Sequence, residues 1–568
     1  MSRDRNVSMD THHSAPAPSR RTASLLGAGM ATGAAITLAV AALAYAWITP
    51  AALPPAGEAP RFVEEAAIAG IDHVYDGEFT FFVGGGVAAF DCDGDGLQDL
   101  YFAGGANPAG MYRNRSSIGG DLVFEQVVSS ATDLVDVTGA YPVDVDSDGQ
   151  VDLAVLGLGE NVLLRGLGDC RFERANELWG IDGGSDWTAA FSASWERGAA
   201  WPTLAFGNYL VLDEERRSTG RCADNQLFRP GADGYGAAQP LSPGWCTLSI
   251  LFYDWDGTGR TDLRMANDRH YYVDGEEQLW RVTPDAPPSL YTIDDGWERV
   301  QIWGMGIATH DLTGDGRPEV FLTSQGDNKL QTLAEGAAGP DYTDIAILRG
   351  VTAHRPYTGG DVMPSTAWHP EFADVNNDGY VDLFVSKGNV EAMPEFAVDD
   401  PSNLLLGRSD GTFVESGLES GIARFTRARG AALVDLNLDG LIDIVEVNRR
   451  SPVAVWRNLG PATGRGTAPE ANWATIRLRQ PAPNVDAVGA WLEVRLDGRS
   501  DARQVTVGGG HAGGSLGWIH VGLGSDETAM LRVRWPGGET GPWIEVPANR
   551  FSVIERGADV AVEWTPAR

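Results

Sequence analysis

The chain has 568 residues, and its 78 Asp and Glu residues outnumber its 43 Lys and Arg residues, which gives a formal net charge of −35 at pH 7. Because like charges repel, this acidic excess argues against nucleic acids and anionic lipid headgroups as partners. Four cysteines are too few to form a disulfide scaffold in a chain of this length.

The first feature along the chain is an uncharged stretch, residues 22–57. Its segment 25–48 is long and apolar enough to span a bilayer. Arginines precede it, so the positive-inside rule predicts a cytoplasmic tail over residues 1–22 and export of everything that follows. We therefore predict a transmembrane anchor or a signal sequence over residues 23–49, followed by a linker over 50–60.

The fate of this segment has two alternatives. If it is not cleaved, it is an N-terminal transmembrane helix that anchors the protein, with the rest of the chain outside the cytoplasm. If it is cleaved, for which Ala44-Tyr45-Ala46 offers a signal-peptidase site, the protein is secreted or periplasmic.

A short acidic loop then recurs six times, with oxygen-bearing side chains at positions 1, 3, 5 and 9 and glycine at position 6. Calcium takes six to eight oxygen ligands, and such a loop can offer its alternate side chains and the carbonyl of position 7. Glycine at position 6 permits the positive φ that the turn requires. The sequence therefore predicts about six calcium ions. The predicted ligands are Asp91, Asp93, Asp95, Leu97, Asp99; Asp144, Asp146, Asp148, Gln150, Asp152; Asp254, Asp256, Thr258, Arg260, Asp262; Asp311, Thr313, Asp315, Arg317, Glu319; Asp374, Asn376, Asp378, Tyr380, Asp382; Asp435, Asn437, Asp439, Leu441 and Asp443.

The last of these loops also satisfies the EF-hand pattern, with Glu446 at position 12. EF-hand loops lie between helices, whereas the segments that flank this loop alternate or are β-branched, as strands do. We therefore interpret Glu446 as an outward-facing strand residue and not as a ligand.

The spacing of the loops predicts seven repeats of roughly 50–60 residues. One interval is double, and Trp187–Tyr209 fits inside it as an eroded copy. Its ligand positions cannot bind a cation; they hold Ala193, Trp195, Arg197 and Trp201. Each repeat contains short strands and glycine turns, which predicts a seven-bladed β-propeller over residues 61–458 that closes on itself and leaves no exposed sheet edge.

This region resembles the VCBS/FG-GAP repeat propellers, the group that includes the integrin α-subunit head. The resemblance rests on the six loops and on the strands that enter them, such as GGGVAAFD (84–91) and GMGIATHD (304–311). It implies a calcium-binding propeller. It says little about function, because these propellers serve adhesion, scaffolding and some enzymes.

A Gly/Pro-rich linker over residues 459–470 precedes a C-terminal region, residues 471–568, in which apolar and polar residues alternate. The alternation predicts a small antiparallel β domain, and so an all-β protein behind one N-terminal transmembrane helix. The region resembles the ASPIC/UnbV domain in NWATIRL (472–478), DAVGAWLEV (486–494), IHVGLG (519–524), VRWPGG (533–538) and VPANRF (546–551). A propeller followed by this domain is the layout of the cartilage acidic protein family and its bacterial relatives. The run GGGHAGGSLGW (508–518) departs from the family.

Of the four cysteines, Cys222 and Cys246 bracket an insertion and are the favoured disulfide pair, whereas Cys92 and Cys170 either pair or stay free. No set of catalytic residues stands out beyond the loops. The sequence favours an exported calcium-binding recognition or scaffold protein whose propeller face binds an extracellular protein or a glycan. The alternative is an extracytoplasmic propeller enzyme that acts on a polysaccharide or another polymer.

One position suggests where a ligand would bind. Five residues before each loop the repeats carry small residues, with His369 as the exception. Our hypothesis is that Trp303, Trp368, His369 and Arg429 form an aromatic and cationic patch at the mouth of the central channel. The alternative is that His369 simply fills a wider gap in its own blade.

Overall fold

The computed structural model describes residues 53–232, 234–268, 273–284, 286–391, 393–461, 471–496 and 498–566. Apart from Leu53 and Pro54, the described residues belong to one compact unit, Pro55–Arg568. The predicted tail (1–22) and the predicted anchor or signal sequence (23–49) are not among them. Within the described residues, no helix is long and apolar enough to cross a membrane.

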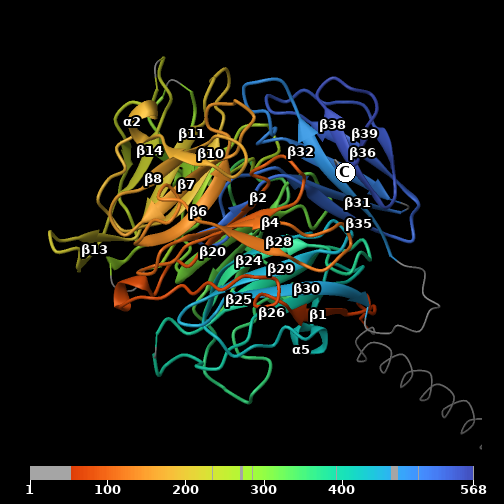
Figure 1. Ribbon diagram of the computed structural model, residues 1–568, viewed down its shortest axis with the longest axis horizontal. Coiled ribbons are helices and arrows are strands. Elements are labelled where there is room, and N and C mark those ends of the chain that lie inside the picture. The colour runs from red at the N-terminus through yellow and green to blue at the C-terminus, as the bar shows by residue number, and fades with distance from the viewer. Residues whose placement is uncertain are drawn as a thin grey trace, which may run out of the picture. The chain divides into compact units, whose positions relative to one another are not determined.

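Seven sheets of the described part follow one plan, in which each strand pairs antiparallel with the next (Figure 1). Sheet 1 contains β2 (Val87–Phe90), β3 (Asp99–Phe102), β4 (Gly110–Asn114) and β5 (Phe124–Val127). Sheet 2 contains β6 (Val137–Val143), β7 (Asp152–Gly157), β8 (Val162–Gly166) and β9 (Phe172–Arg174). Sheet 3 contains β10 (Thr188–Ser194), β11 (Thr203–Asn208), β14 (Asn225–Phe228) and β15 (Gln239–Leu241), with β12 (Leu210–Leu212) and β13 (Ser218–Cys222) as an inserted hairpin.

The remaining four sheets repeat this order. Sheet 4 contains β16 (Thr247–Tyr253), β17 (Asp262–Asn267), β18 (Gln278–Arg281) and β19 (Ser289–Leu290). Sheet 5 contains β20 (Gly304–His310), β21 (Glu319–Ser324), β22 (Lys329–Leu333) and β23 (Tyr342–Asp344). Sheet 6 contains β24 (Ala367–Ala373), β25 (Asp382–Lys387), β26 (Asn403–Gly407) and β27 (Phe413–Glu415). Sheet 7 contains β28 (Ala428–Val434), β29 (Asp443–Asn448), β30 (Ala454–Pro461) and, from the other end of the chain, β1 (Pro60–Glu64).

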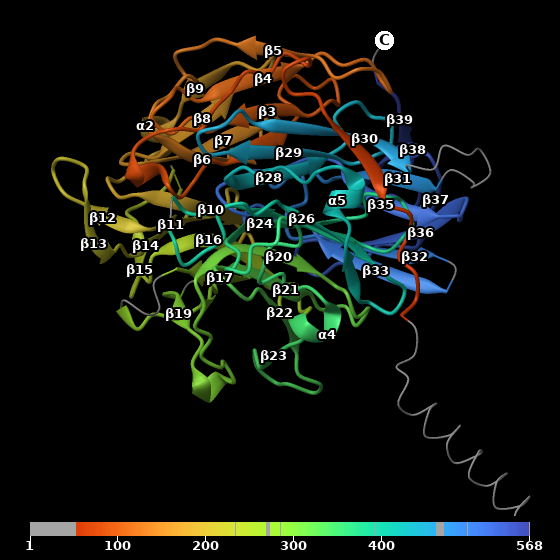
Figure 2. The same cartoon turned by 90° about the horizontal axis from the view of Figure 1, so that it is seen from below.

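The first strands of the seven sheets form a closed ring. Strands β2, β6, β10, β16, β20, β24 and β28 each pack against the next, and β28 packs against β2. Strand β1 pairs antiparallel with β30, so the start of the chain completes the last sheet (Figures 1 and 2). The seven sheets therefore form a ring, and the fold is β-propeller-like. A ring closed in this way removes the free edges that open sheets expose.

Helical segments are few and short in the described part. They are η1 (Phe79–Phe81), α2 (Asn176–Trp179), η2 (Ile293–Asp295), α4 (Ala346–Arg349) and α5 (Gly417–Ser420). Helices α2, α4 and α5 each follow or border the outermost strands of a sheet, and each ends at a glycine in the left-handed region. They belong to the outer turns of the repeats.

The C-terminal region contributes two further four-stranded sheets. One contains β35 (Ile519–Gly524), β31 (Asn472–Arg479), β38 (Arg550–Glu555) and β39 (Val562–Trp564). The other contains β33 (Arg499–Gln504), β32 (Trp491–Leu496), β36 (Thr528–Arg534) and β37 (Ile544–Pro547). One apolar core lies between them. The prediction of a purely antiparallel domain is wrong in one detail, because β31 pairs parallel with β38, which brings the two ends of the domain side by side.

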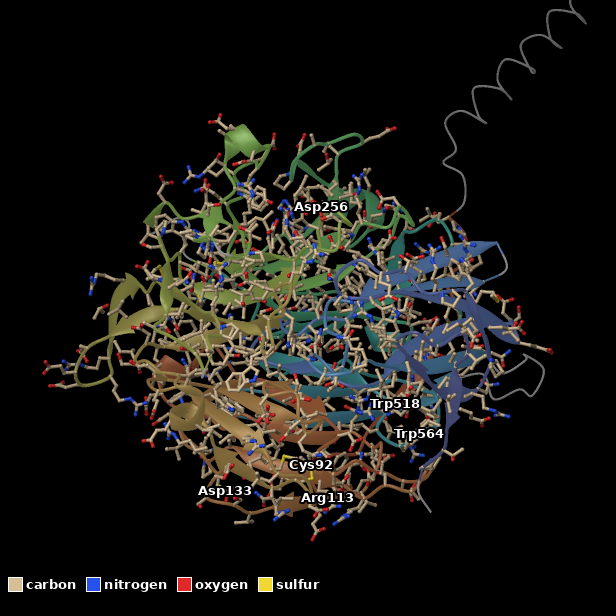
Figure 3. The ribbon with its side chains drawn as sticks, turned by 90° about the horizontal axis from the view of Figure 1, so that it is seen from above. Cys92, Arg113, Asp133, Asp256, Trp518 and Trp564 are labelled. Atoms are coloured by element: carbon tan, nitrogen blue, oxygen red, sulfur yellow. A yellow bond between two sulfur atoms is a disulfide. The ribbon has the colours of Figure 1, made fainter. Side chains whose placement is uncertain are left out.

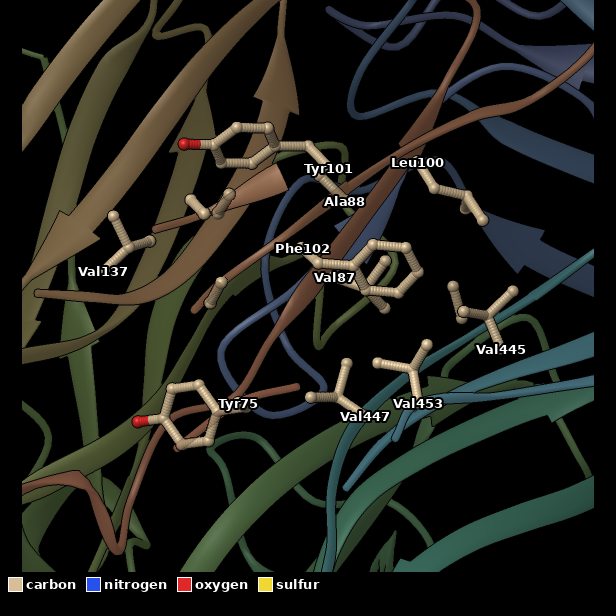
Figure 4. Packing of buried hydrophobic residues seen from close by; sticks show 14 of the residues in the cluster. Tyr75, Val87, Ala88, Leu100, Tyr101, Phe102, Val137, Val445, Val447 and Val453 are labelled. Atoms are coloured by element: carbon tan, nitrogen blue, oxygen red, sulfur yellow. The ribbon is translucent and has the colours of Figure 1, made fainter. Parts of the chain in front are cut away.

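Burial decreases from the centre of the ring outward. Strands β6, β10, β16 and β28 are buried along their whole length, whereas β5, β9 and β23 are largely exposed. Apolar clusters fill the spaces between neighbouring sheets. Figure 4 shows Val87 and Phe102 of sheet 1 packed near Val445 and Val447 of sheet 7. At about 25 cal/mol per Å² of buried apolar surface, these clusters are the main source of stability.

The interpretation of Glu446 as an outward-facing residue is wrong. The side chain is buried, and its carboxylate accepts a hydrogen bond from the Ser402 hydroxyl in the neighbouring sheet. The alternation of apolar and polar residues in β29 does not predict which side chains are exposed, because an inner strand of the ring has neighbours on both faces.

A first prediction concerns the apolar contacts between sheets. We expect Phe102→Ala to lower the free energy of unfolding by about 3–5 kcal/mol, because the fully buried ring leaves a cavity between sheets 1 and 7. Phe425→Ala is the matched control, since that ring is 52% exposed. Chemical denaturation measures both, and equal losses for the two variants would contradict the role of the inter-sheet core.

Candidate calcium sites and the channel that they surround

The six acidic loops join the first strand to the second in sheets 1, 2, 4, 5, 6 and 7. All predicted ligand positions therefore fall within these loops. The glycine at position 6 has φ between +82° and +91° in every loop, as the sequence predicts; these residues are Gly96, Gly149, Gly259, Gly316, Gly379 and Gly440. Position 4 is also left-handed in every loop, with φ from +55° to +79°, even where it holds Ser147, Asn377 or Leu438. The sequence analysis missed this second turn, although glycine at position 4 in three loops was a signal for it.

Each loop curls around the carboxylate at position 1. The N–H of the glycine at position 6 donates to that carboxylate in all six loops, at 2.7–3.1 Å. In five loops the N–H at position 7 donates to the carboxylate at position 5, at 2.8–3.0 Å. These bonds fix the turn of each loop around the carboxylates at positions 1 and 5.

The carboxylate at position 9 has a second role that spacing alone did not indicate. In sheet 1, Asp99 accepts the N–H of Cys92 at 2.7 Å and the N–H of Asn114, on the third strand, at 2.8 Å. The same two bonds recur at Asp152, Asp382 and Asp443. Position 9 therefore ties its loop to the third strand of its own sheet.

Burial leaves these carboxylates short of solvation. Burial and the neighbouring Asp439 raise the pKa of Asp435 to about 8. Burial and nearby carboxylates raise the pKa of Asp144 to about 7. A cation at the centre of each loop would stabilise the ionised forms.

The residues of the sixth loop fit calcium best. Asn437 is fully buried, and its Oδ1 atom has no hydrogen-bond partner among the described residues. In the first two loops, carboxylates from positions 1, 3 and 9 lie within 4.8 Å of one another. Calcium would take its oxygen ligands from these groups, so the donor set agrees with the predicted metal.

Arginines reach several loops as well. Arg113 pairs with Asp93, and Arg165 lies 2.8 Å from both Asp146 and Asp148. In the third loop, protein donors already occupy one of the carboxylates. There, Asp262 Oδ2 accepts from Trp255, Tyr291 and Arg260 together. We therefore expect the third loop to be the weakest of the six sites.

The repeat of sheet 3 lacks the acidic loop, and other interactions stabilise the connection between its first two strands. Between β10 and β11, Glu196 lies 2.6 Å from the guanidinium of Arg229 and accepts a hydrogen bond from Thr203. Arg229 also donates to the carbonyls of Thr283 and Ala286 in the next repeat. An ion pair between protein side chains thus stabilises the connection in sheet 3.

The structure contains two disulfides. One joins Cys222 to Cys246, the pair that the sequence favours, and closes the insertion of sheet 3. The other joins Cys92, at position 2 of the first loop, to Cys170 in sheet 2 (Figure 3). The first calcium loop is therefore covalently fixed to its neighbour.

The hypothesis of an open ligand patch is wrong. Trp368 and Arg429 are fully buried, and His369 is 2% exposed. Their side chains do meet, since the Arg429 guanidinium lies 4.1 Å from the ring centre of Trp368. However, they meet around His511 of the C-terminal region: its N–H donates to His369 Nδ1 at 3.0 Å, and its ring lies 4.9 Å from that of Trp368. Trp303 packs against Phe396, with 6.3 Å between the ring centres.

The reason is that residues Val507–Leu516, here called the axial segment, fill the centre of the ring. Strand β34 (Gly514–Ser515) pairs parallel with β2. Other residues of the segment form bridges to sheets 2, 3, 4 and 5, namely Ala140–Gly513, Ala193–Val507, Leu251–Gly508 and Ile307–Gly510. The channel of the ring is thus occupied by the chain itself.

The axial segment explains the small residues five positions before the loops. A Cβ atom on Gly86 would lie 1.7 Å from the carbonyl oxygen of Ala512, and one on Gly139 would lie 2.2 Å from it. These glycines admit the backbone of the axial segment. The glycine-rich run at 508–518 was the signal available in the sequence, but no local pattern indicated that this run would lie in the centre of the ring.

Comparisons with known sequences define the class of protein. The family model "FG-GAP-like repeat" matches residues 91–155 and 311–385, and the model "ASPIC and UnbV" matches residues 480–561. The chain therefore carries FG-GAP-like repeats followed by an ASPIC and UnbV domain, which confirms the resemblance found in the sequence.

The chain has weak homology to cartilage acidic protein 1. It is 23% identical to the Xenopus tropicalis protein over 251 residues, which cover 42% of this chain and 36% of that protein. It is 26% identical to the Homo sapiens protein over 159 residues, which cover 26% of this chain and 21% of that protein. The matched regions thus span 36% of the length of one relative and 21% of the other.

Several solved structures show low similarity to this chain. A lectin from Agrocybe aegerita that recognises non-reducing terminal N-acetylglucosamine is 16% identical, with 66% of this chain and 94% of that chain covered and a TM-score of 0.37. PorZ, a surface component of the type-IX secretion system of Porphyromonas gingivalis, is 10% identical, with 89% and 61% covered and a TM-score of 0.38. Similarity this low carries no functional assignment.

A second prediction follows from the buried carboxylates. In calcium-free buffer, lowering the pH from 8 to 6 should raise the melting temperature. Asp435 and Asp144 have folded-state pKa values of about 8 and about 7, above their usual 3.8, so their protonated forms favour the folded state and that stability is lost as the pH rises through these values.

Calorimetry at pH 6, 7 and 8, with and without calcium, measures this effect. Saturating calcium should remove it, because a bound cation stabilises the ionised carboxylates. The same pH dependence in both buffers would contradict a cation at these loops.

Proposed function

We propose that the protein is an exported calcium-binding recognition scaffold. In this proposal each of the seven sheets is one blade of a propeller, and the loops of six blades hold about six calcium ions. The observation that carries the proposal is the recurrence, six times, of one loop geometry, in which the glycine N–H at position 6 donates to the carboxylate at position 1; in the first two loops, three carboxylates also lie within 4.8 Å of one another.

The role of calcium in this proposal is structural. The side chains at positions 1, 3, 5 and 9 and the carbonyl at position 7 would bind the ion, and position 9 also connects the loop to the third strand. When bound, calcium supplies the positive charge that offsets the buried carboxylates. The FG-GAP-like repeats support a recognition scaffold, and the partner would be an extracellular protein or a glycan.

The surface for that partner is restricted. The axial segment fills the channel, and the C-terminal sheets contact the calcium loops, which supports a partner surface on the outer strands or on the side of the ring away from the loops. The net charge of −35 makes nucleic acid an unsuitable partner.

Two observations support export: the uncharged segment near the N-terminus and the disulfides. Disulfides persist in oxidising compartments, and both pairs of cysteines are joined. Whether residues 23–49 stay as an anchor or are cleaved, the propeller would then meet the calcium of the extracytoplasmic space.

The alternative of a polymer-degrading enzyme receives less support. His310, His369 and Glu371 contribute to the lining of one cavity. His310 lies 2.5 Å from Asp501, and His369 lies 3.2 Å from Glu371. That cavity lies beside the axial segment and has a volume of about 260 Å³. Pockets for drug-sized ligands have roughly 300–1,000 Å³, so a polymer would not fit.

A third prediction tests the calcium sites through Asp435→Asn. With calcium, the variant should bind one ion fewer and melt at a lower temperature. A ligand at about 100 times its Kd adds about 2.7 kcal/mol per site, and this contribution would be lost. Without calcium and above pH 8, where Asp435 is ionised, the same variant should be as stable as the parent or more stable, because a buried charge has been removed.

Isothermal titration calorimetry and thermal melts measure both effects. Asp121→Asn is the matched control, since its side chain is 96% exposed and lies outside the loops. Magnesium should restore the chelated protein less well than calcium. A parent protein whose melt does not change in chelator would refute the proposal.

A further inference from the structure

The C-terminal region contacts three of the loops at positions 4 and 6, which are not predicted metal ligands. Trp518 Nε1 donates to the carbonyl of Gly96, at position 6 of the first loop, at 3.0 Å. His520 Nε2 lies 2.6 Å from Asn377 Oδ1, at position 4 of the fifth loop. The N–H of Asn484 donates to the hydroxyl of Ser147, at position 4 of the second loop, at 3.1 Å.

The other three loops are contacted as well. Trp491 Nε1 donates to Asp254 in the third loop at 3.1 Å, and the N–H of Asp311 in the fourth loop donates to the carbonyl of Ala502 at 3.3 Å. The indole of Trp473 covers Gly440 in the sixth loop so closely that a Cβ atom there would lie 1.9 Å from it. The docked region therefore contacts all six loops.

Most of these contacts depend on the left-handed turns at positions 4 and 6. A Cβ atom on Gly96 would lie 2.3 Å from the Trp564 ring, so the glycine serves both the turn and the docking of the C-terminal sheets. Figure 3 shows Trp518 beside Trp564, and their ring centres are 5.0 Å apart. The turns hold this shape because the carboxylates point inward, and without a cation those carboxylates repel one another.

The axial segment is continuous with this interface, since Leu516 and Trp518 are separated by one residue. Within the ring, Gly509 donates to the carbonyl of Ile250 and Gly510 donates to that of Ile307, both at 2.7 Å. The Ser192 hydroxyl donates to the carbonyl of Val507 at 2.6 Å. Insertion of the axial segment and docking of the C-terminal sheets are therefore a single event.

We propose that calcium binding and this docking are thermodynamically coupled, so that the central channel is a binding site for the chain's own axial segment and the calcium-filled loops hold the segment in place. The proposal rests on the calcium sites of the proposed function. Coupling between two binding events is reciprocal. Calcium must then favour the inserted segment, and the docking contacts must raise the affinity for calcium.

Hydrogen exchange of the full-length protein, followed by mass spectrometry over a calcium titration, tests the first direction. We expect the peptide that contains residues 507–516 to lose its protection as calcium is removed, at the same calcium concentrations at which the loops release it. Peptides from β32 and β36, in the core of the C-terminal sheets, should stay protected, which distinguishes undocking from unfolding.

Isothermal titration calorimetry with calcium tests the reverse direction. Trp518→Phe keeps a ring but loses the hydrogen bond to Gly96, and a single hydrogen bond corresponds to about a five-fold change in affinity. We therefore expect calcium affinity to fall by up to about five-fold. Trp543→Phe is the matched control, because that ring lies between Arg495 and Arg532 within the C-terminal sheets.

The outcomes separate the two proposals. Calcium binding with unchanged affinity in Trp518→Phe would overturn the coupling and leave the proposed function intact. Equal protection of the axial segment with and without calcium, in a protein that binds calcium, would do the same. Absence of calcium binding in the parent protein would overturn both. If calcium removal unfolds the whole chain, the calcium affinities of Trp518→Phe and Trp543→Phe decide whether the coupling exists.

Discussion

The burial of carboxylates in six loops is the constraint around which the ring is organised. Ionised groups taken out of water are costly unless charges or hydrogen bonds replace the lost solvation. The fold supplies backbone N–H groups to positions 1 and 9 and brings Arg113 and Arg165 to the first two loops. Sheet 3 shows the alternative solution, in which Arg229 and Glu196 form an ion pair between protein groups. A repeat can therefore keep its shape with an internal cation, provided that the acidic positions are lost with the metal site.

The hydrogen bonds that position 9 accepts connect strands, and this connection offsets the electrostatic cost of burying the loop's carboxylates. Asp99 connects the loop to the third strand of sheet 1, and Asp152, Asp382 and Asp443 do the same elsewhere. The loop is therefore a junction between three strands and not a mere turn between two. This arrangement stiffens the inner part of each sheet, where neighbouring sheets meet and where the axial segment must fit without steric clash.

The sequence predicted the features that are local. The left-handed glycines, the strand on either side of each loop and the FG-GAP-like and ASPIC/UnbV pattern all follow from spacing within a few residues. Features that depend on residues far apart in the chain were missed. Trp368, His369 and Arg429 were rightly grouped but wrongly given to an external ligand, because their partner His511 lies in the other region. Glu446 was placed on the surface because its strand pattern does not record the neighbouring sheet that supplies Ser402.

The pairing of β1 with β30 has a consequence for biogenesis. The register places Phe62 opposite Asn458, so the first strand of the ring finds its partner only after all the other strands of the ring have been made. During synthesis, that strand has an unpaired edge, which invites association with other chains. The axial segment is synthesised later still. An incompletely synthesised chain is thus a ring without closure or filling, and it is prone to aggregate until its last residues are made.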